Sequence, residues 1–150
     1  MATRRYDFLT GIETPSIPVT TPADSPGDAF VLGNYNSFTI VNNQGSAASI
    51  TDLVLDKAGF RSALVRFHIF RSSVGGQTRA QSGLFEMIND GTNWELAPLG
   101  SGTVPNTGDC GVEFTITSAG QVQYTSDDNG GAYVAANSIL LWKFMDVTEV

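Results

Sequence analysis

From Phe30 onward, short runs of apolar and β-branched residues alternate with clusters of turn-forming residues. No segment sustains the 3.6-residue spacing of apolar side chains that marks an amphipathic helix. The runs recur at roughly 8–12 residues, a spacing typical of β-sandwiches and β-barrels. The pattern therefore predicts an all-β domain of antiparallel strands closed into a sandwich or barrel.

The strands themselves follow from the apolar runs and the turns between them. The clearest hairpin joins residues 112–117 to residues 121–124 through Ser118-Ala119-Gly120, because apolar and polar side chains alternate along its first strand. Asn89-Asp90-Gly91 supplies residues that tolerate a positive φ, which favours a second tight turn. We expect eight strands, at residues 37–41, 48–55, 63–72, 80–89, 94–99, 111–117, 121–126 and 138–147.

Two of these strands have no wholly polar face. Along residues 64–70, three apolar side chains (Val65, Phe67 and Ile69) alternate with a mixed set of basic and apolar ones. Residues 139–145 are apolar on both faces except for Lys143. We expect the first of these strands to be covered on both sides, by the N-terminal segment or by a neighbouring subunit. The second is expected to be a central strand or to lie against a subunit interface.

The N-terminal segment differs in composition from the rest. Four of the six prolines fall within residues 1–28. Proline fixes φ and lacks an amide donor, so it excludes a helix or a central strand there. We expect an extended proline-rich arm over residues 1–28 and a β-domain over residues 29–150. The arm begins with cationic and apolar side chains that favour docking over an inert leader: Arg4, Arg5, Tyr6, Phe8 and Leu9.

Length and charge exclude several classes of function. A chain of 150 residues is the size of one domain. Its net charge of −7, with only eight Lys and Arg residues, makes it a poor non-specific binder of nucleic acid. No apolar run is long enough for a membrane-spanning helix, and no apolar segment follows Arg4 and Arg5 as in a signal peptide. We expect neither nucleic acid nor a membrane as a partner.

The sequence offers no catalytic constellation. His68 is the single histidine and Cys110 the single cysteine, so nucleophile triads and zinc sites lack their usual members. The acidic loop at residues 127–131 lacks the ligand spacing of an EF-hand, so a plain turn is favoured over a calcium site. We therefore predict a chain that is not an enzyme and that uses no metal or cofactor.

Four arginines fall close together in the sequence, at Arg61, Arg66, Arg71 and Arg79. On adjacent strands they form either a solvated stripe of charge or a contact with the acidic edge of a second subunit. As candidate subunit-interface residues we take Arg61, Arg66, His68 and Arg71. The large aromatic residues Trp94 and Trp142 are expected in the core rather than on a sugar-binding platform.

Several stretches resemble the small β-sandwich domains of tailed-bacteriophage virion proteins, which occur as capsid cement or decoration proteins and as tail-fibre modules. The resemblance rests on a basic-rimmed strand, a hairpin ending in Asp-Gly, a Gly-Asp-x-Gly-Val-x-Phe strand and a Val-x-Tyr-Thr-Ser strand. These lie at residues 61–71, 81–91, 108–114 and 121–126. Residues 5–15 also resemble a virion attachment leader.

The resemblance implies an eight-stranded antiparallel jelly-roll sandwich, a homotrimer and a place on a virion. The leading hypothesis is a cement or decoration protein on the capsid surface. It would bind the major capsid protein or another virion protein through the arm and the oligomer interfaces. The alternative is a tail-fibre or head-fibre module that recognises a host-surface glycan. An exposed aromatic cleft, with Trp94 or Tyr133 beside Asp127 and Asn129, would favour that alternative.

Overall fold

A computed structural model describes residues 4–6, 13–15, 35–105 and 109–150. Contacts group the chain into two units, Met1–Tyr35 and Asn36–Val150. In the first unit, β1 (Arg4–Tyr6) pairs antiparallel with β2 (Glu13–Pro15), a pairing that the proline-rich sequence did not predict. Two of the predicted arm residues, Phe8 and Leu9, lie outside the described residues.

The larger sheet of the second unit is antiparallel throughout. Its strands follow the order β3-β11-β5-β6-β7, and β10 pairs with one end of β5. Their bounds are β3 (Asn36–Thr39), β5 (Phe60–Val74), β6 (Thr78–Asn89), β7 (Trp94–Val104), β10 (Ala132–Tyr133) and β11 (Ile139–Glu149). A single 3₁₀ turn at Ala135–Asn137 precedes β11.

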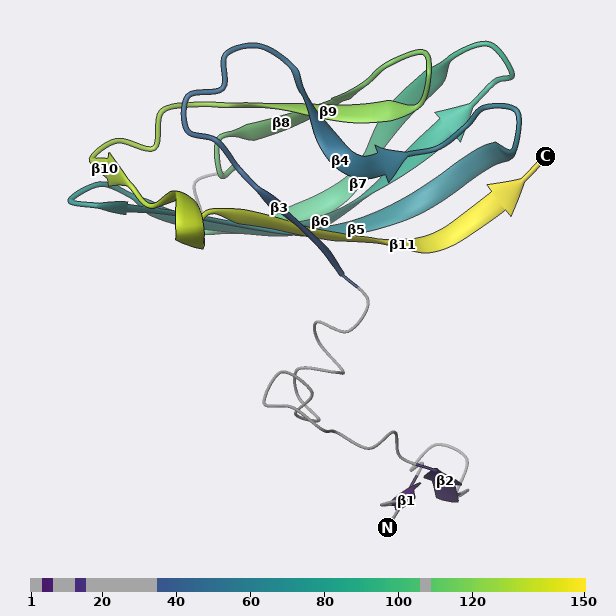
Figure 1. Cartoon of the computed structure of the whole chain (residues 1–150), viewed down its shortest axis with the longest axis horizontal. Helices are drawn as coiled ribbons and strands as arrows, with labels where there is room; N and C mark the ends of the chain where they lie inside the picture. Colours follow the sequence, from purple (N-terminus) through teal and green to yellow (C-terminus); the bar gives the residue numbers. More distant parts are fainter. Residues whose placement is uncertain (1–3, 7–12, 16–34, 106–108) are drawn as a thin grey trace. The chain divides into compact units, whose positions relative to one another are not determined.

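The smaller sheet has the order β4-β9-β8, with β4 (Ala48–Val54), β9 (Gln121–Ser126) and β8 (Val112–Ile116). Figure 1 shows its strands packed as a second layer over one face of the larger sheet. No helix within the described residues is long and apolar enough to cross a membrane.

The core lies between the two layers. Odd-numbered residues of β5 point into it from Ala63 to Ser73, because successive side chains of a strand point to opposite faces. They meet apolar residues of β6, β11 and the smaller sheet, including Met87, Leu140 and Val122. Trp94 and Trp142 are 4% and 2% exposed, which confirms their predicted place in the core.

All eight predicted segments overlap a strand, so the prediction of an all-β antiparallel sandwich is confirmed. The short strand β10 was missed because two residues carry no alternation pattern. The described sheets of the second unit contain six and three strands, and the jelly-roll topology implied by the resemblance is not confirmed.

Candidate functional site

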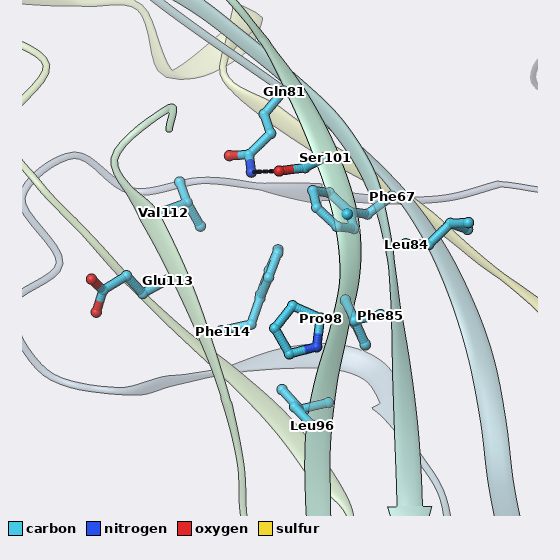
Figure 2. A pocket seen from close by; sticks show the side chains of 11 residues that line it. Phe67, Gln81, Leu84, Phe85, Leu96, Pro98, Ser101, Val112, Glu113 and Phe114 are labelled. Atoms are coloured by element: carbon cyan, nitrogen blue, oxygen red, sulfur yellow. Dashed lines mark hydrogen bonds between the residues drawn. The ribbon is translucent and has the colours of Figure 1, made fainter. Parts of the chain in front are cut away.

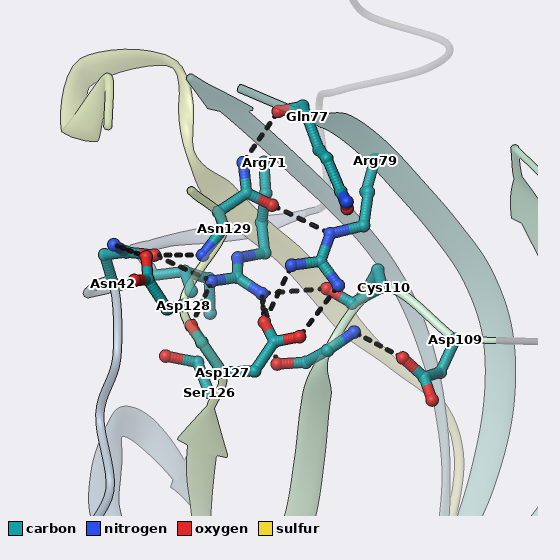
Figure 3. A network of polar contacts seen from close by, with 12 residues as sticks. Asn42, Arg71, Gln77, Arg79, Asp109, Cys110, Ser126, Asp127, Asp128 and Asn129 are labelled. Carbon is teal, nitrogen blue, oxygen red and sulfur yellow. Dashed lines mark hydrogen bonds and ion pairs between the residues drawn. The ribbon is translucent and has the colours of Figure 1, made fainter. Parts of the chain in front are cut away.

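Two buried arginines close one end of the sandwich (Figure 3). Arg71 on β5 is fully buried, and Arg79 on β6 is 8% exposed. Both contact the carboxylate of Asp127, which follows β9. Arg79 binds it in a bidentate manner, with Nη1 donating to Oδ2 at 2.9 Å and Nη2 donating to Oδ1 at 2.8 Å. Arg71 donates from Nη1 to the same Oδ1, so two cations share one carboxylate.

Arg71 also ties together three loops. Its Nη1 donates to the carbonyl oxygens of Cys110, at 2.9 Å, and Gly111, at 3.1 Å. Its Nη2 donates to the backbone carbonyl of Asp127 at 2.7 Å and to Oδ1 of Asn42 at 3.1 Å. These residues precede β8, follow β9 and follow β3. One side chain therefore supplies donors that satisfy buried carbonyls from separate parts of the chain.

Asn129 completes the network. Its side chain accepts a hydrogen bond from Nε of Arg79 at 2.8 Å and donates to the hydroxyl of Ser73 and the carbonyl of Gln77. Partial burial raises the pKa of Asp127, but hydrogen bonds from Arg79 and Arg71 outweigh that effect, and the pKa is lowered overall. The 127–131 loop thus holds arginine side chains. Among the described residues, no cluster of three or more His, Cys, Asp or Glu side chains could hold a metal ion.

Cys110 lies beside this network and is buried. Its thiol is 3.0 Å from Oε1 of Gln81. Burial raises the pKa of the Cys110 thiol to about 11, against the opposing effect of Arg71. The reactive thiolate is therefore scarce at neutral pH, as expected for a structural cysteine.

An apolar pocket of about 450 Å³ opens between β6 and β7 of the larger sheet and β8 of the smaller one (Figure 2). Three phenylalanine rings form its inner wall, with the Phe67 ring centroid 5.2 Å from that of Phe114 and 5.8 Å from that of Phe85. At its rim, Nε2 of Gln81 donates to the hydroxyl of Ser101 at 2.9 Å. The lining suits an apolar group and provides no pair of titratable side chains for acid–base chemistry.

The third candidate is the face of the larger sheet turned away from the core, here called the outer face. It carries the even-numbered residues of β5 and the residues paired with them. Its apolar row runs across four strands as Ile139, Phe70, Ala80 and Val104. Phe70 is 40% exposed and Val104 is 71% exposed. No strand described within residues 36–150 packs on this face.

Next to the apolar row lies a group of basic side chains. Arg66 on β5 is directly opposite Lys143 on β11, and His68 is opposite Leu141. Burial lowers the pKa of His68, and the positive charges of Arg66 and Lys143 lower it further. The outer face therefore combines half-exposed apolar side chains with a basic centre.

The predicted stripe of four arginines is wrong. Arg66 and Arg71 are five positions apart, an odd number, so they point to opposite faces of β5. Arg71 and Arg79 are enclosed in the core, which removes the Arg71 side chain from any contact with a second subunit. Arg61 and Arg66 are exposed and His68 is half-buried. A subunit interface at these three residues stays a prediction.

Of the two aromatic residues predicted to lie beside Asp127, Trp94 lies elsewhere, whereas Tyr133 lies next to Arg71, which binds Asp127. Trp94 is buried near Gly120, which comes before β9, whereas Asp127 follows the end of β9. Tyr133 lies against Arg71, with the guanidinium carbon 5.8 Å from the ring centroid, and its hydroxyl donates to the carbonyl of Ile40. The sequence analysis missed the buried network, although residue parity along β5 already placed Arg71 among the core positions.

No protein-family model matches the chain, and no curated protein matches it. Among solved structures, the tailspike protein of Acinetobacter phage vB_ApiP_P1 aligns with 78% of this chain at 12% sequence identity and a TM-score of 0.42. The alignment covers 20% of the tailspike chain. At that score, the match assigns neither fold nor function to this chain.

Proposed function

We propose that this chain is a structural component of a bacteriophage particle that works by docking onto another protein rather than by catalysis. The observation that carries the proposal is the outer face of the larger sheet. Exposed apolar side chains such as Phe70 and Val104 lie there beside basic ones. Apolar surface of this kind, surrounded by polar groups, marks protein interaction sites. The resemblance of residues 61–71, 81–91, 108–114 and 121–126 to virion β-sandwich domains supplies the context.

In the finer form of the proposal, the partner is the assembled capsid shell and the chain acts as cement on the capsid surface. A protein that binds the assembled lattice, but not its separated parts, stabilises the lattice by mass action. Attachment by the arm, through Arg4, Arg5, Tyr6, Phe8 and Leu9, and assembly as a homotrimer belong to this proposal. Repeated copies on one particle would raise the effective binding strength without a large interface per copy.

The alternative is a tail-fibre or head-fibre module. It shares the docking function but places the chain elsewhere on the particle. Recognition of a host glycan would depend on Tyr133, which lies against Arg71 beside Asp127, because Trp94 and Trp142 are buried. A tail or fibre position does not require glycan binding, because the outer face would then contact another fibre or tail protein.

The deciding experiment locates the protein on particles. The phage that encodes the chain would be grown with an epitope tag on it, and purified particles would be examined by electron microscopy with a tag-directed label. Label over the head, together with lower heat stability of particles that lack the chain, would support the cement role. Label on the tail, with impaired adsorption of the same deletion particles, would support the alternative. Purified particles without the chain would contradict both.

A further inference from the structure

We infer, on the basis of the proposed function, that the partner presents carboxylate side chains surrounded by apolar ones, and that these carboxylates bind at Arg66, His68 and Lys143 of the outer face. The inference names the chemistry of the partner, which neither the fold nor the resemblance specifies.

The placement of the basic residues is the first support. Arg66 and Lys143 are register partners on neighbouring strands, so two cationic side chains lie next to each other on this face. His68 stands two residues from Arg66 on the same face. Burial is the main cause of its lowered pKa, and the positive charges of Arg66 and Lys143 lower it further. The chain as a whole carries a net charge of −7. A basic group at the centre of one face of an acidic protein selects partners of negative charge.

The apolar row provides the second support. Leu141 lies opposite His68, and one step further along the strands the row of Ile139, Phe70 and Val104 begins. An apolar contact that excludes water beside an ion pair lowers the local dielectric and strengthens the attraction. Docked surfaces typically combine such an apolar centre with charged groups that fix the orientation. The partner is therefore expected to place its carboxylates next to apolar side chains.

The surroundings limit where the carboxylates can bind. Glu86 on β6 and Asp146 on β11 lie on either side of Leu64 in the next row, so acidic groups border the basic centre on that side. The apolar row borders it on the other. A partner carboxylate is attracted to the rows of Arg66 and His68 and repelled by the row of Leu64. The outer face therefore fixes the orientation of the partner along the strands.

A charge-reversal pair tests the inference. Lys143→Glu is compared with Lys57→Glu, which makes the same charge change at an exposed turn residue outside the sheets. Binding of each full-length variant would be measured on purified particles that were grown without the chain. Lys143→Glu should weaken binding by about tenfold or more, and Lys57→Glu should not. If the wild-type chain binds and both variants bind equally well, the proposed function stands and the inference fails.

A second measurement separates the chemistry of the outer face from the identity of the particle. A synthetic peptide of alternating glutamate and leucine would be titrated into the full chain and followed by NMR. Shifts at the amides of Arg66, His68 and Lys143 that disappear in Lys143→Glu would support an acidic, apolar partner even if no particle binds. Shifts elsewhere, or none, would overturn the inference. So would a dimer of the chain in solution that Lys143→Glu dissociates, because a second copy would then occupy the outer face.

Discussion

The strongest test of the structural reasoning is the substitution Asp127→Asn. It keeps the size of the side chain and one acceptor oxygen, but it removes the only carboxylate that directly contacts Arg71 and Arg79 in the described structure. Two buried guanidinium groups would then face amide and carbonyl oxygens alone. Arg71 is fully buried, so water reaches this contact only from the side of Asp127.

The expected loss of stability depends on how deeply Arg71 and Asp127, the two partners of the ion pair, are buried. Breaking a fully buried ion pair by removing one partner costs about 3–5 kcal/mol. The Asp127 side chain is 50% exposed, so solvent already screens part of the attraction, and we reduce the expected loss to about 2–3 kcal/mol. For a domain of this size, that corresponds to a fall in Tm of roughly 6–15 °C.

Tryptophan fluorescence provides the assay. Trp94 and Trp142 are both buried, so unfolding by urea or heat exposes them to water and shifts their emission. The matched control is Asp128→Asn, because Asp128 is exposed and its carboxylate accepts hydrogen bonds only from Asn42 and the Gly130 amide among the described contacts. The reasoning is refuted if Asp127→Asn unfolds at the same urea concentration as the wild type or as the control.

The same variant should change how stability depends on pH. The folded-state pKa of Asp127 lies below its unfolded value, so its stabilising contribution is complete above the unfolded pKa of about 3.9 and is lost as pH falls through the folded pKa. The difference in unfolding free energy between the wild type and Asp127→Asn should therefore be constant near neutral pH and shrink below about pH 4. A difference that stays constant down to pH 2 would show that the carboxylate is not the origin of the effect.

Three further outcomes are expected. The buried thiol of Cys110, with its pKa raised to about 11, should resist alkylation at pH 8 in the folded protein and react fully in urea, as mass spectrometry would show; full reaction in the folded state would contradict its burial. Gly83→Ala should lower the free energy of unfolding in urea titrations by about 1–3 kcal/mol, because its added Cβ would lie 2.6 Å from the carbonyl oxygen of Gly100. Gly102→Ala serves as the control, because a Cβ there meets no atom within 4 Å. Arg66→Gln should raise the pKa of His68 in an NMR titration, since it removes one of the two positive charges that lower it; an unchanged pKa would mean that Arg66 does not contribute to the shift.

Local patterns were sufficient to predict most of the strands. The hairpin of β8 and β9 was expected from alternation and from Ser118-Ala119-Gly120, and both signals act over a few residues. Gly120 has a φ of +85°, and a Cβ there would lie 2.0 Å from the carbonyl oxygen of Leu55. The turn therefore requires glycine both for its positive φ and for the close approach of Leu55. Only the first requirement is local to the hairpin, and it accounts for the glycine signal in the sequence.

The sequence contains no comparable local signal for which distant strands pair with each other. Strand β11 pairs with both β3 and β5, which joins the end of the chain to segments far earlier in the sequence. The ion pair of Arg71 with Asp127 spans 56 residues. Alternation predicts which face of a strand a residue occupies, but it does not predict which loop lies opposite. The core position of Arg71 could therefore be inferred from its parity, whereas its partner required the assembled sandwich.

Strand β5 shows why structural and binding roles can be separated in this domain. Phe70 and Arg71 are neighbours in the sequence, yet one lies on the outer face and the other anchors the buried network. Asp127→Asn should therefore lower stability without altering the charge or the apolar row of the outer face. At temperatures below its unfolding transition, the variant should bind particles as the wild type does, while Lys143→Glu should remain folded and bind weakly. If both substitutions impaired binding equally in the folded state, the two faces of β5 would be coupled, and the outer face could not be treated as an independent docking surface.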